Sequence, residues 1–127
     1  MTERPPLDTP QAGVVLDVDY TKGAFELVLV NAGDQVAHDV SVVFSRPLIG
    51  ARNVRVSELP LFRRLGVLRP GREVRVFLDS ATDLLRRRKS NTFRATVTWR
   101  DGMGRAHQAQ YRHDLDAYRG LPEVIIP

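Results

Sequence analysis

The sequence contains no cysteine, and it has one tryptophan and two methionines among its 127 residues. The absence of cysteine excludes disulfide bonds and thiolate metal sites. No stretch approaches the roughly 18 to 20 consecutive apolar residues that span a bilayer. The opening residues Met1 to Pro6 also lack the charged and then apolar pattern of a secretory signal. We therefore expect a cytoplasmic protein, or a component of a larger particle, that makes no contact with a membrane.

Lysine is scarce as well, because Lys22 and Lys89 are the only two and arginine carries almost all of the positive charge. The net charge is +4, but it is unevenly distributed along the chain. Residues 1–45 hold seven acidic and two basic side chains, whereas residues 46–127 hold eight acidic and 17 basic ones. This asymmetry predicts one electronegative and one electropositive face on the folded protein.

The length predicts one domain with a hydrophobic core of its own. Residues 1–13 contain Pro5, Pro6 and Pro10, which prevent regular pairing with a sheet, so we expect a flexible proline-rich arm there. We assign residues 14–119 to the folded domain and residues 120–127 to a C-terminal tail.

Alternation of apolar and polar residues, which is typical of strands, recurs along the domain. The clearest case has Phe93, Ala95, Val97 and Trp99 on one face and Arg94 among the residues on the other. A short fourth strand is also expected, although its pattern is weaker. The expected strands, in order, are 14–20, 25–30, 40–44, 53–56 (Asn53 to Val56), 74–78, 92–99 and 105–113.

Turn signals separate these strands. Thr21-Lys22-Gly23 predicts a three-residue hairpin loop closed by a G1 bulge, and Pro70-Gly71 predicts a type II turn, because glycine permits a positive φ at the second central position. Asn31 to Asp34 and Asp101 to Gly104 have the composition of turns.

Two segments break the strand pattern. Leu59 to Leu68 has leucines at helical spacing and predicts a helical turn packed across an open edge. Ser80 lies three residues before Asp83, a spacing at which its hydroxyl accepts from the Asp83 amide, so we expect a short helix over Ala81 to Lys89.

Seven short strands with turns every 8–12 residues predict an all-β, seven-stranded antiparallel immunoglobulin-like sandwich with one or two short helical turns. A small barrel is the structural alternative. No expected helix is long enough for a βαβ crossover, which disfavours a parallel sheet.

Two segments carry a family resemblance: LVLVNAGDQVAHDVSVVF (residues 27–44) and LGVLRPGREVRVFL (residues 65–78). In these segments the chain resembles bacterial immunoglobulin-like modules of the cell-adhesion-related type. The matching positions are Asn31, Gly33, Ala37, Val40, Leu68, Pro70 and Gly71. The C-terminal RHDLDAYRGLPEV is similar to short uncharacterised proteins of actinobacteria and their phages. The resemblance implies a sandwich fold and a binding or assembly role, and it carries no catalytic residue.

The residues that commonly bind metals or catalyse reactions form no recognisable motif. His107 and His113 lie six residues apart on one expected strand, about 20 Å apart at ~3.3 Å per residue, and His38 is remote in sequence. No serine lies in a Gly-x-Ser-x-Gly elbow. Gly102-Met103-Gly104 lies between two strands, so no helix N-terminus there points at a phosphate. We expect no metal, no cofactor and no enzymatic activity.

Arginines cluster in the two irregular segments and near the turn between them. If those segments lie at one edge of the sandwich, they form one positive patch. We consider three interpretations: a solvated face, contact with an acidic protein subunit, or contact with nucleic acid. The candidate partner-binding residues are Arg63, Arg64, Arg69, Arg72, Arg86, Arg87, Arg88 and Lys89.

The branched apolar run Val124, Ile125 and Ile126 is the last candidate. It either packs on its own domain or adds a strand to a neighbour's sheet edge. We therefore predict a non-catalytic structural or assembly module that binds other protein subunits, copies of itself included, through charged faces and terminal arms. The alternative is an accessory nucleic-acid-binding protein that uses the arginine-rich patch.

Overall fold

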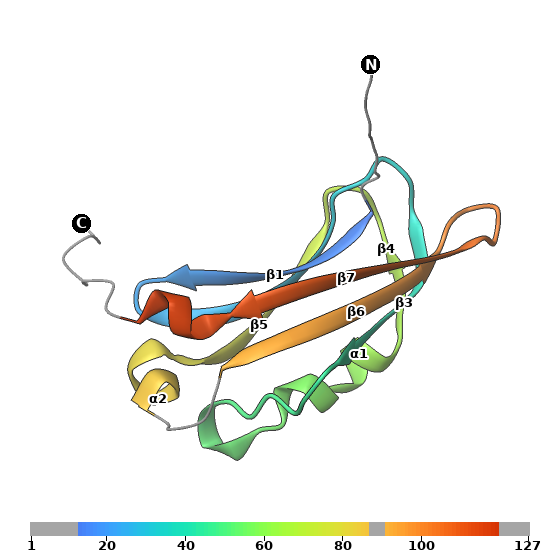
Figure 1. Cartoon of the computed structure of the whole chain (residues 1–127). Coiled ribbons are helices and arrows are strands. Elements are labelled where there is room, and N and C mark those ends of the chain that lie inside the picture. Colours follow the sequence, from blue (N-terminus) through green and yellow to red (C-terminus); the bar gives the residue numbers. More distant parts are fainter. Residues whose placement is uncertain (1–12, 87–90, 120–127) are drawn as a thin grey trace.

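The structure, a computed structural model, describes residues 13–86 and 91–119 (Figure 1). In this part of the chain seven antiparallel strands form two sheets, ordered β1-β2-β5 and β4-β3-β6-β7. The strands are β1 (Val14–Thr21), β2 (Ala24–Asn31), β3 (Ala37–Phe44), β4 (Leu65–Leu68), β5 (Glu73–Ser80), β6 (Thr92–Arg100) and β7 (Ala106–Asp114).

The all-β sandwich expected from the sequence is thereby confirmed, and its ladders form two separate sheets rather than a closed barrel. If the strands are lettered in chain order as A, B, C, C′, E, F and G, the sheets become A-B-E and C′-C-F-G. This is the immunoglobulin-like arrangement with a C′ strand and without a strand D.

Period-two burial builds the core between the two sheets. Phe93, Ala95 and Val97 of β6 are buried and face Leu16 and Leu27 of the other sheet within one hydrophobic cluster. β2 is the central strand of its sheet, which explains why it is apolar on both faces. The alternation seen in the sequence therefore assigns the inward faces correctly.

The β1–β2 hairpin differs from the expectation of a three-residue loop. Thr21 pairs directly with Ala24, so the loop contains only Lys22 and Gly23. Both have positive φ, 54° and 75°, as a type I′ turn requires. The G1-bulge prediction was wrong because Lys22 adopts a left-handed conformation that its residue type does not indicate.

The connection between β3 and β4 is where the sequence was most misleading. The strand expected over Asn53 to Val56 is absent: that region has two short 3-10 turns, η2 (Ala51–Asn53) and η3 (Val56–Glu58), and a single bridge between Ile49 and Arg55. The expected helical turn is limited to α1 (Pro60–Arg63), and the fourth strand is β4, which pairs with β3.

Asn31 links two turns at one end of the sandwich. Its side-chain amide donates to the carbonyls of Gln35 and Leu68, both at 2.8 Å, and its Oδ1 accepts from the amide of Gly33 at 2.9 Å. The Pro70-Gly71 turn is confirmed as type II, with φ of 80° at Gly71. The Gly71 amide donates to the Asn31 carbonyl at 2.8 Å.

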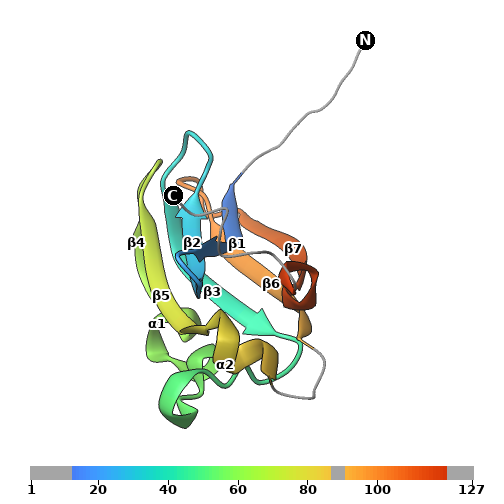
Figure 2. The same cartoon turned by 90° about the vertical axis from the view of Figure 1, so that its left-hand side faces the viewer.

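The opposite end of the sandwich is closed by α2 (Ala81–Arg86) and the 3-10 turn η4 (Leu115–Tyr118) (Figure 2). The predicted cap is confirmed, because the Asp83 amide donates to Ser80 Oγ at 3.1 Å. The expected extension of this helix to Lys89 lies outside the described residues. Tyr118 packs its ring 5.2 Å from that of Tyr20.

The outer edge of β1 lies beside β7, and side chains from β7 bond to it. The Tyr111 hydroxyl donates to the Val14 carbonyl at 3.0 Å. The His113 Nε2 lies 2.8 Å from the Leu16 carbonyl and donates to it, since a carbonyl can only accept. One open side of the sandwich is therefore closed by side chains instead of a strand ladder.

Candidate functional site

The outer face of the β1-β2-β5 sheet is acidic. Arg75 is the only basic side chain on these three strands, and four acidic side chains share the outer face with it: Asp17, Asp19, Glu26 and Glu73. The fifth carboxylate of the strands, Asp79, is only 3% exposed and pairs with the buried Phe25, so it does not belong to this face. The Arg75 guanidinium donates to Asp19 at 2.7 Å, to Glu26 at 2.8 Å and to Glu73 at 2.6 Å. These bonds raise the pKa of Arg75, and the Arg75 bond is the main reason that the pKa of Asp19 lies below its usual value.

The strands of the β4-β3-β6-β7 sheet have the opposite bias, with three arginines against Asp39 and Asp114. Arg94 on β6 and Arg112 on β7 are direct cross-strand partners, and both are exposed. Like charges directly opposite one another destabilise an antiparallel pair. Neither guanidinium has a hydrogen bond or ion pair within the described residues to offset that repulsion.

The candidate arginines of the sequence do not all lie together. Arg63 and Arg64 immediately precede β4, and Arg69 and Arg72 follow it, so these four flank one edge strand. All four are exposed, and none has an ion pair within the described residues. They form a basic stripe along β4.

Arg86 lies apart from this stripe, at the end of α2. The eight residues of β5 separate the turn that carries Arg69 and Arg72 from the start of α2, a distance of roughly 25 Å at about 3.3 Å per residue. Arg86 and these two arginines therefore lie at opposite ends of the sandwich, so they do not share one compact patch. Arg87, Arg88 and Lys89 lie outside the described residues, as do Val124, Ile125 and Ile126.

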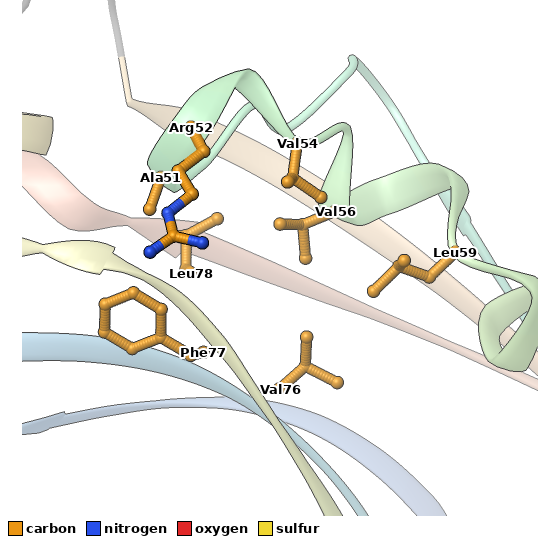
Figure 3. Close-up of a pocket in the computed structure, with 8 residues that line it drawn as sticks. All are labelled: Ala51, Arg52, Val54, Val56, Leu59, Val76, Phe77 and Leu78. Carbon is orange, nitrogen blue, oxygen red and sulfur yellow. The ribbon is translucent and has the colours of Figure 1, made fainter.

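An apolar hollow lies beside β5, with a volume of about 490 Å³ (Figure 3). Its lining comes from the β3–β4 connection and from the second half of β5: Ala51, Arg52, Val54, Val56, Leu59, Val76, Phe77 and Leu78. Arg52 is the one charged residue of this lining, and Figure 3 shows its guanidinium turned toward Phe77 and Leu78. The sequence did not indicate the hollow, since it forms between segments about 20 residues apart that no local pattern joins.

His107 and His113 have the same-face placement that the sequence predicted, since both occupy register positions opposite inward residues of β6. His107 stacks on Trp99, with ring centroids 5.5 Å apart, and its Nε2 lies 2.8 Å from Asp101 Oδ2. This bond is the main cause that lowers the pKa of Asp101 to about 2. His107 through Asp101, and His113 through the Leu16 carbonyl, are thus each engaged in a contact that stabilises the fold.

No group of three or more metal-ligating side chains occurs in the part of the chain that the structure describes. Ser41, Ser45, Ser57 and Ser80 bond to backbone amides or to a threonine. Within residues 13–86 and 91–119 no serine hydroxyl bonds to a histidine, and no helix has the length and apolar character needed to cross a bilayer.

The fold and these surfaces define a small immunoglobulin-like sandwich with oppositely charged sheets. Residues 4–119 match a family described as a domain of unknown function, DUF8453, and the chain belongs to that family. No curated protein matches the chain. No solved structure matches it either.

Proposed function

We propose that this protein is a non-catalytic assembly module that binds other protein subunits, copies of itself included, through its oppositely charged sheet faces. One observation carries the proposal. The outer face of one sheet carries four acidic side chains and one arginine, and the strands of the other sheet hold three arginines and two acidic side chains. The outer faces of a two-layer sandwich point in opposite directions, so one molecule presents both halves of a complementary contact.

Contact between an acidic face and a basic face is heterologous, because each partner uses a different surface. Such contacts build rings if the rotation between neighbours closes, and filaments if it does not. The attraction steers encounter and sets orientation, and salt screens it over a Debye length of about 8 to 10 Å at ordinary ionic strength. Association is therefore expected to weaken as salt is added.

The Arg94–Arg112 pair supports the same proposal. Two exposed guanidinium groups held opposite each other repel, and an approaching carboxylate relieves that repulsion. The acidic face supplies exposed carboxylates at Asp17 and Glu73, which lie on its two edge strands.

The test is sedimentation velocity of the full chain between about 25 mM and about 500 mM salt. We expect association at low salt that weakens at high salt, and loss of this face-to-face association for the variant Arg94→Glu with Arg112→Glu. The matched control, Arg94→Lys with Arg112→Lys, retains the charge and should still associate. A wild-type monomer at low salt that also captures no partner from its native source would contradict the proposal.

The basic stripe along β4 favours a second candidate, an accessory nucleic-acid-binding protein. Its support is the exposure of Arg63, Arg64, Arg69 and Arg72 beside an edge strand, without ion pairs in the described part of the chain. Gel shifts with DNA and RNA at low salt test it. Binding that falls steeply with salt and with alanine at these four positions would support it, and no shift at low salt would remove it.

A further inference from the structure

β5 is an edge strand with no strand partner on its outer side in the described part of the chain. Immunoglobulin-like sheets of the A-B-E-D type place strand D at this position. Here the chain turns directly from β4 into β5 at Pro70-Gly71, so no strand of the described residues fills the fourth position of the three-stranded sheet. The β3–β4 connection covers only its Leu78 end, where Gly50 lies against the Leu78 carbonyl. The part of β5 from Glu73 to Phe77 has no strand beside it on this side within residues 13–86 and 91–119, and exposed edges of this kind are templates for an added strand.

The position next to this edge is hollowed and apolar. The 490 Å³ hollow is bounded on one side by Val76 and Leu78 of β5, and exposed apolar side chains border it. Phe77 is 52% exposed and Val54 is 44% exposed, which is unusual for side chains of this size that lie close together. A branched apolar side chain placed in the hollow would cover both of them.

Arg52 adds a charge requirement. It lies on the lip of the hollow, and its guanidinium has no hydrogen bond or ion pair within the described residues. Arg52 and Asn53 have φ of 59° and 60°, a left-handed pair that orients the Arg52 side chain over Phe77 (Figure 3). An occupant therefore needs branched apolar side chains and one adjacent carboxylate.

We propose that the hollow and the Glu73–Phe77 edge of β5 bind the segment Glu123–Ile126 from a second copy of this chain as an added β-strand. This inference rests on the proposed role in subunit assembly and names one contact of it. The segment reads Glu-Val-Ile-Ile, so it combines one carboxylate with three residues that favour strands. Strand addition obtains affinity from main-chain hydrogen bonds and specificity from pockets for alternate side chains.

The alternation of a strand matches the alternation of the site. Val124 and Ile126 point to one side of an extended segment, where they meet the side of Val76. Glu123 points to the other side, where it meets the Arg52 guanidinium. One register therefore satisfies both the apolar and the charged requirements of the hollow.

The binding test titrates a fluorescent peptide of residues 119–127 with the full chain carrying Val124→Ser, Ile125→Ser and Ile126→Ser, so that its own tail does not compete. We expect saturable binding that weakens about tenfold with Arg52→Glu, through loss of a charge-assisted bond and added repulsion. A Glu123→Lys peptide should bind the Arg52→Glu protein better than it binds the protein with Arg52. The matched control is Val67→Ser, at a side chain 54% exposed on β4, which should leave binding unchanged.

No saturable binding, or binding indifferent to Arg52→Glu, would overturn the inference. The inference would also be overturned if the wild-type chain stays monomeric and yet does not bind the peptide. The segment would then occupy the hollow of its own molecule. These results are distinct from failure of the charged-face proposal. Face-to-face association depends on Arg94 and Arg112 and should persist, with its salt dependence, in the chain with the three tail serines.

Discussion

Replacing Asn31 with alanine tests how the two turns at one end of the sandwich are held together. The side chain is 1% exposed, and it makes three hydrogen bonds to backbone groups, two in the loop between β2 and β3 and one in β4. Two of these bonds join its amide to the carbonyls of Gln35 and Leu68, and the third joins its Oδ1 to the Gly33 amide. Alanine removes all three and leaves the Leu68 carbonyl buried without that donor.

The expected loss follows from the count of bonds. A buried hydrogen bond contributes about 1 kcal/mol net, so three give a loss of about 3 kcal/mol in the free energy of unfolding. A domain of this size loses about 4 °C in Tm per kcal/mol, so we expect Tm to fall by about 12 °C. Because domains unfold with only about 5 to 15 kcal/mol, Asn31→Ala would remove a large part of the total.

The assay is urea unfolding followed by circular dichroism, with thermal unfolding as the second measurement. Gln35→Ala is the matched control, because only the Gln35 carbonyl takes part and the substitution retains it. Asn31→Asp should be at least as destabilising as Asn31→Ala, since a carboxylate would face two carbonyl oxygens. A loss below about 0.5 kcal/mol for Asn31→Ala, the usual range for a surface substitution, would refute the reasoning.

Three further predictions concern the turns and packing. Gly50→Ala should destabilise by about 1 to 3 kcal/mol in urea unfolding, because its Cβ would overlap the Leu78 carbonyl oxygen of β5. Lys22→Gly should stabilise by about 0.5 to 1 kcal/mol, because glycine adopts the positive φ of the type I′ turn without steric cost. The Asp101 carboxyl should titrate by NMR at pH about 2. Since this folded pKa lies below the unfolded value of about 4, the Asp101 carboxylate stabilises the fold fully above pH 4, and this stabilisation is lost as the pH falls through 2. Asp101→Asn should remove this part of the pH dependence of stability. An ordinary pKa for Asp101 would contradict the bond to His107.

The sequence predicts the sandwich because burial alternates within single strands. In β6 each residue's own neighbours show which face is inward, so Phe93 and Val97 are assigned without knowledge of the partner strand. The type II turn and the Ser80 cap were likewise predictable, because local residue type determines both.

The rest depends on tertiary contacts. β4 is a strand because it pairs with β3, and nothing in Leu65 to Leu68 by itself distinguishes it from a continuation of α1. The hollow forms where the β3–β4 connection passes β5, which no periodicity reports. The Arg94–Arg112 pairing was also not predictable, because a hairpin centred on Asp101 to Gly104 places Arg94 opposite Tyr111. The loop includes Arg105 as well, so Arg100 pairs with Ala106 and the register moves by one residue.

Two features of the charge distribution follow from the sequence. The acidic first third and the arginine-rich remainder predict two faces of opposite sign, and the strands of the two sheets carry that bias. The separation of Arg86 from Arg69 and Arg72 also follows from the sequence, because the expected strand 74–78 lies between them and carries the chain from one end of the sandwich to the other.

The most direct measurement of face-to-face assembly mixes two variants and follows them by sedimentation velocity at low salt. One variant carries Arg94→Glu and Arg112→Glu, so both of its faces are acidic. The other carries Asp17→Lys and Glu73→Lys, which leave Asp19 and Glu26 against Arg75 and the two new lysines, so its acidic face becomes weakly basic. Both variants also carry Val124→Ser, Ile125→Ser and Ile126→Ser, so that the tail contact does not contribute. The account predicts that each variant alone is a monomer and that the mixture forms a complex of the two. A mixture that remains monomeric while the wild-type chain associates would contradict it.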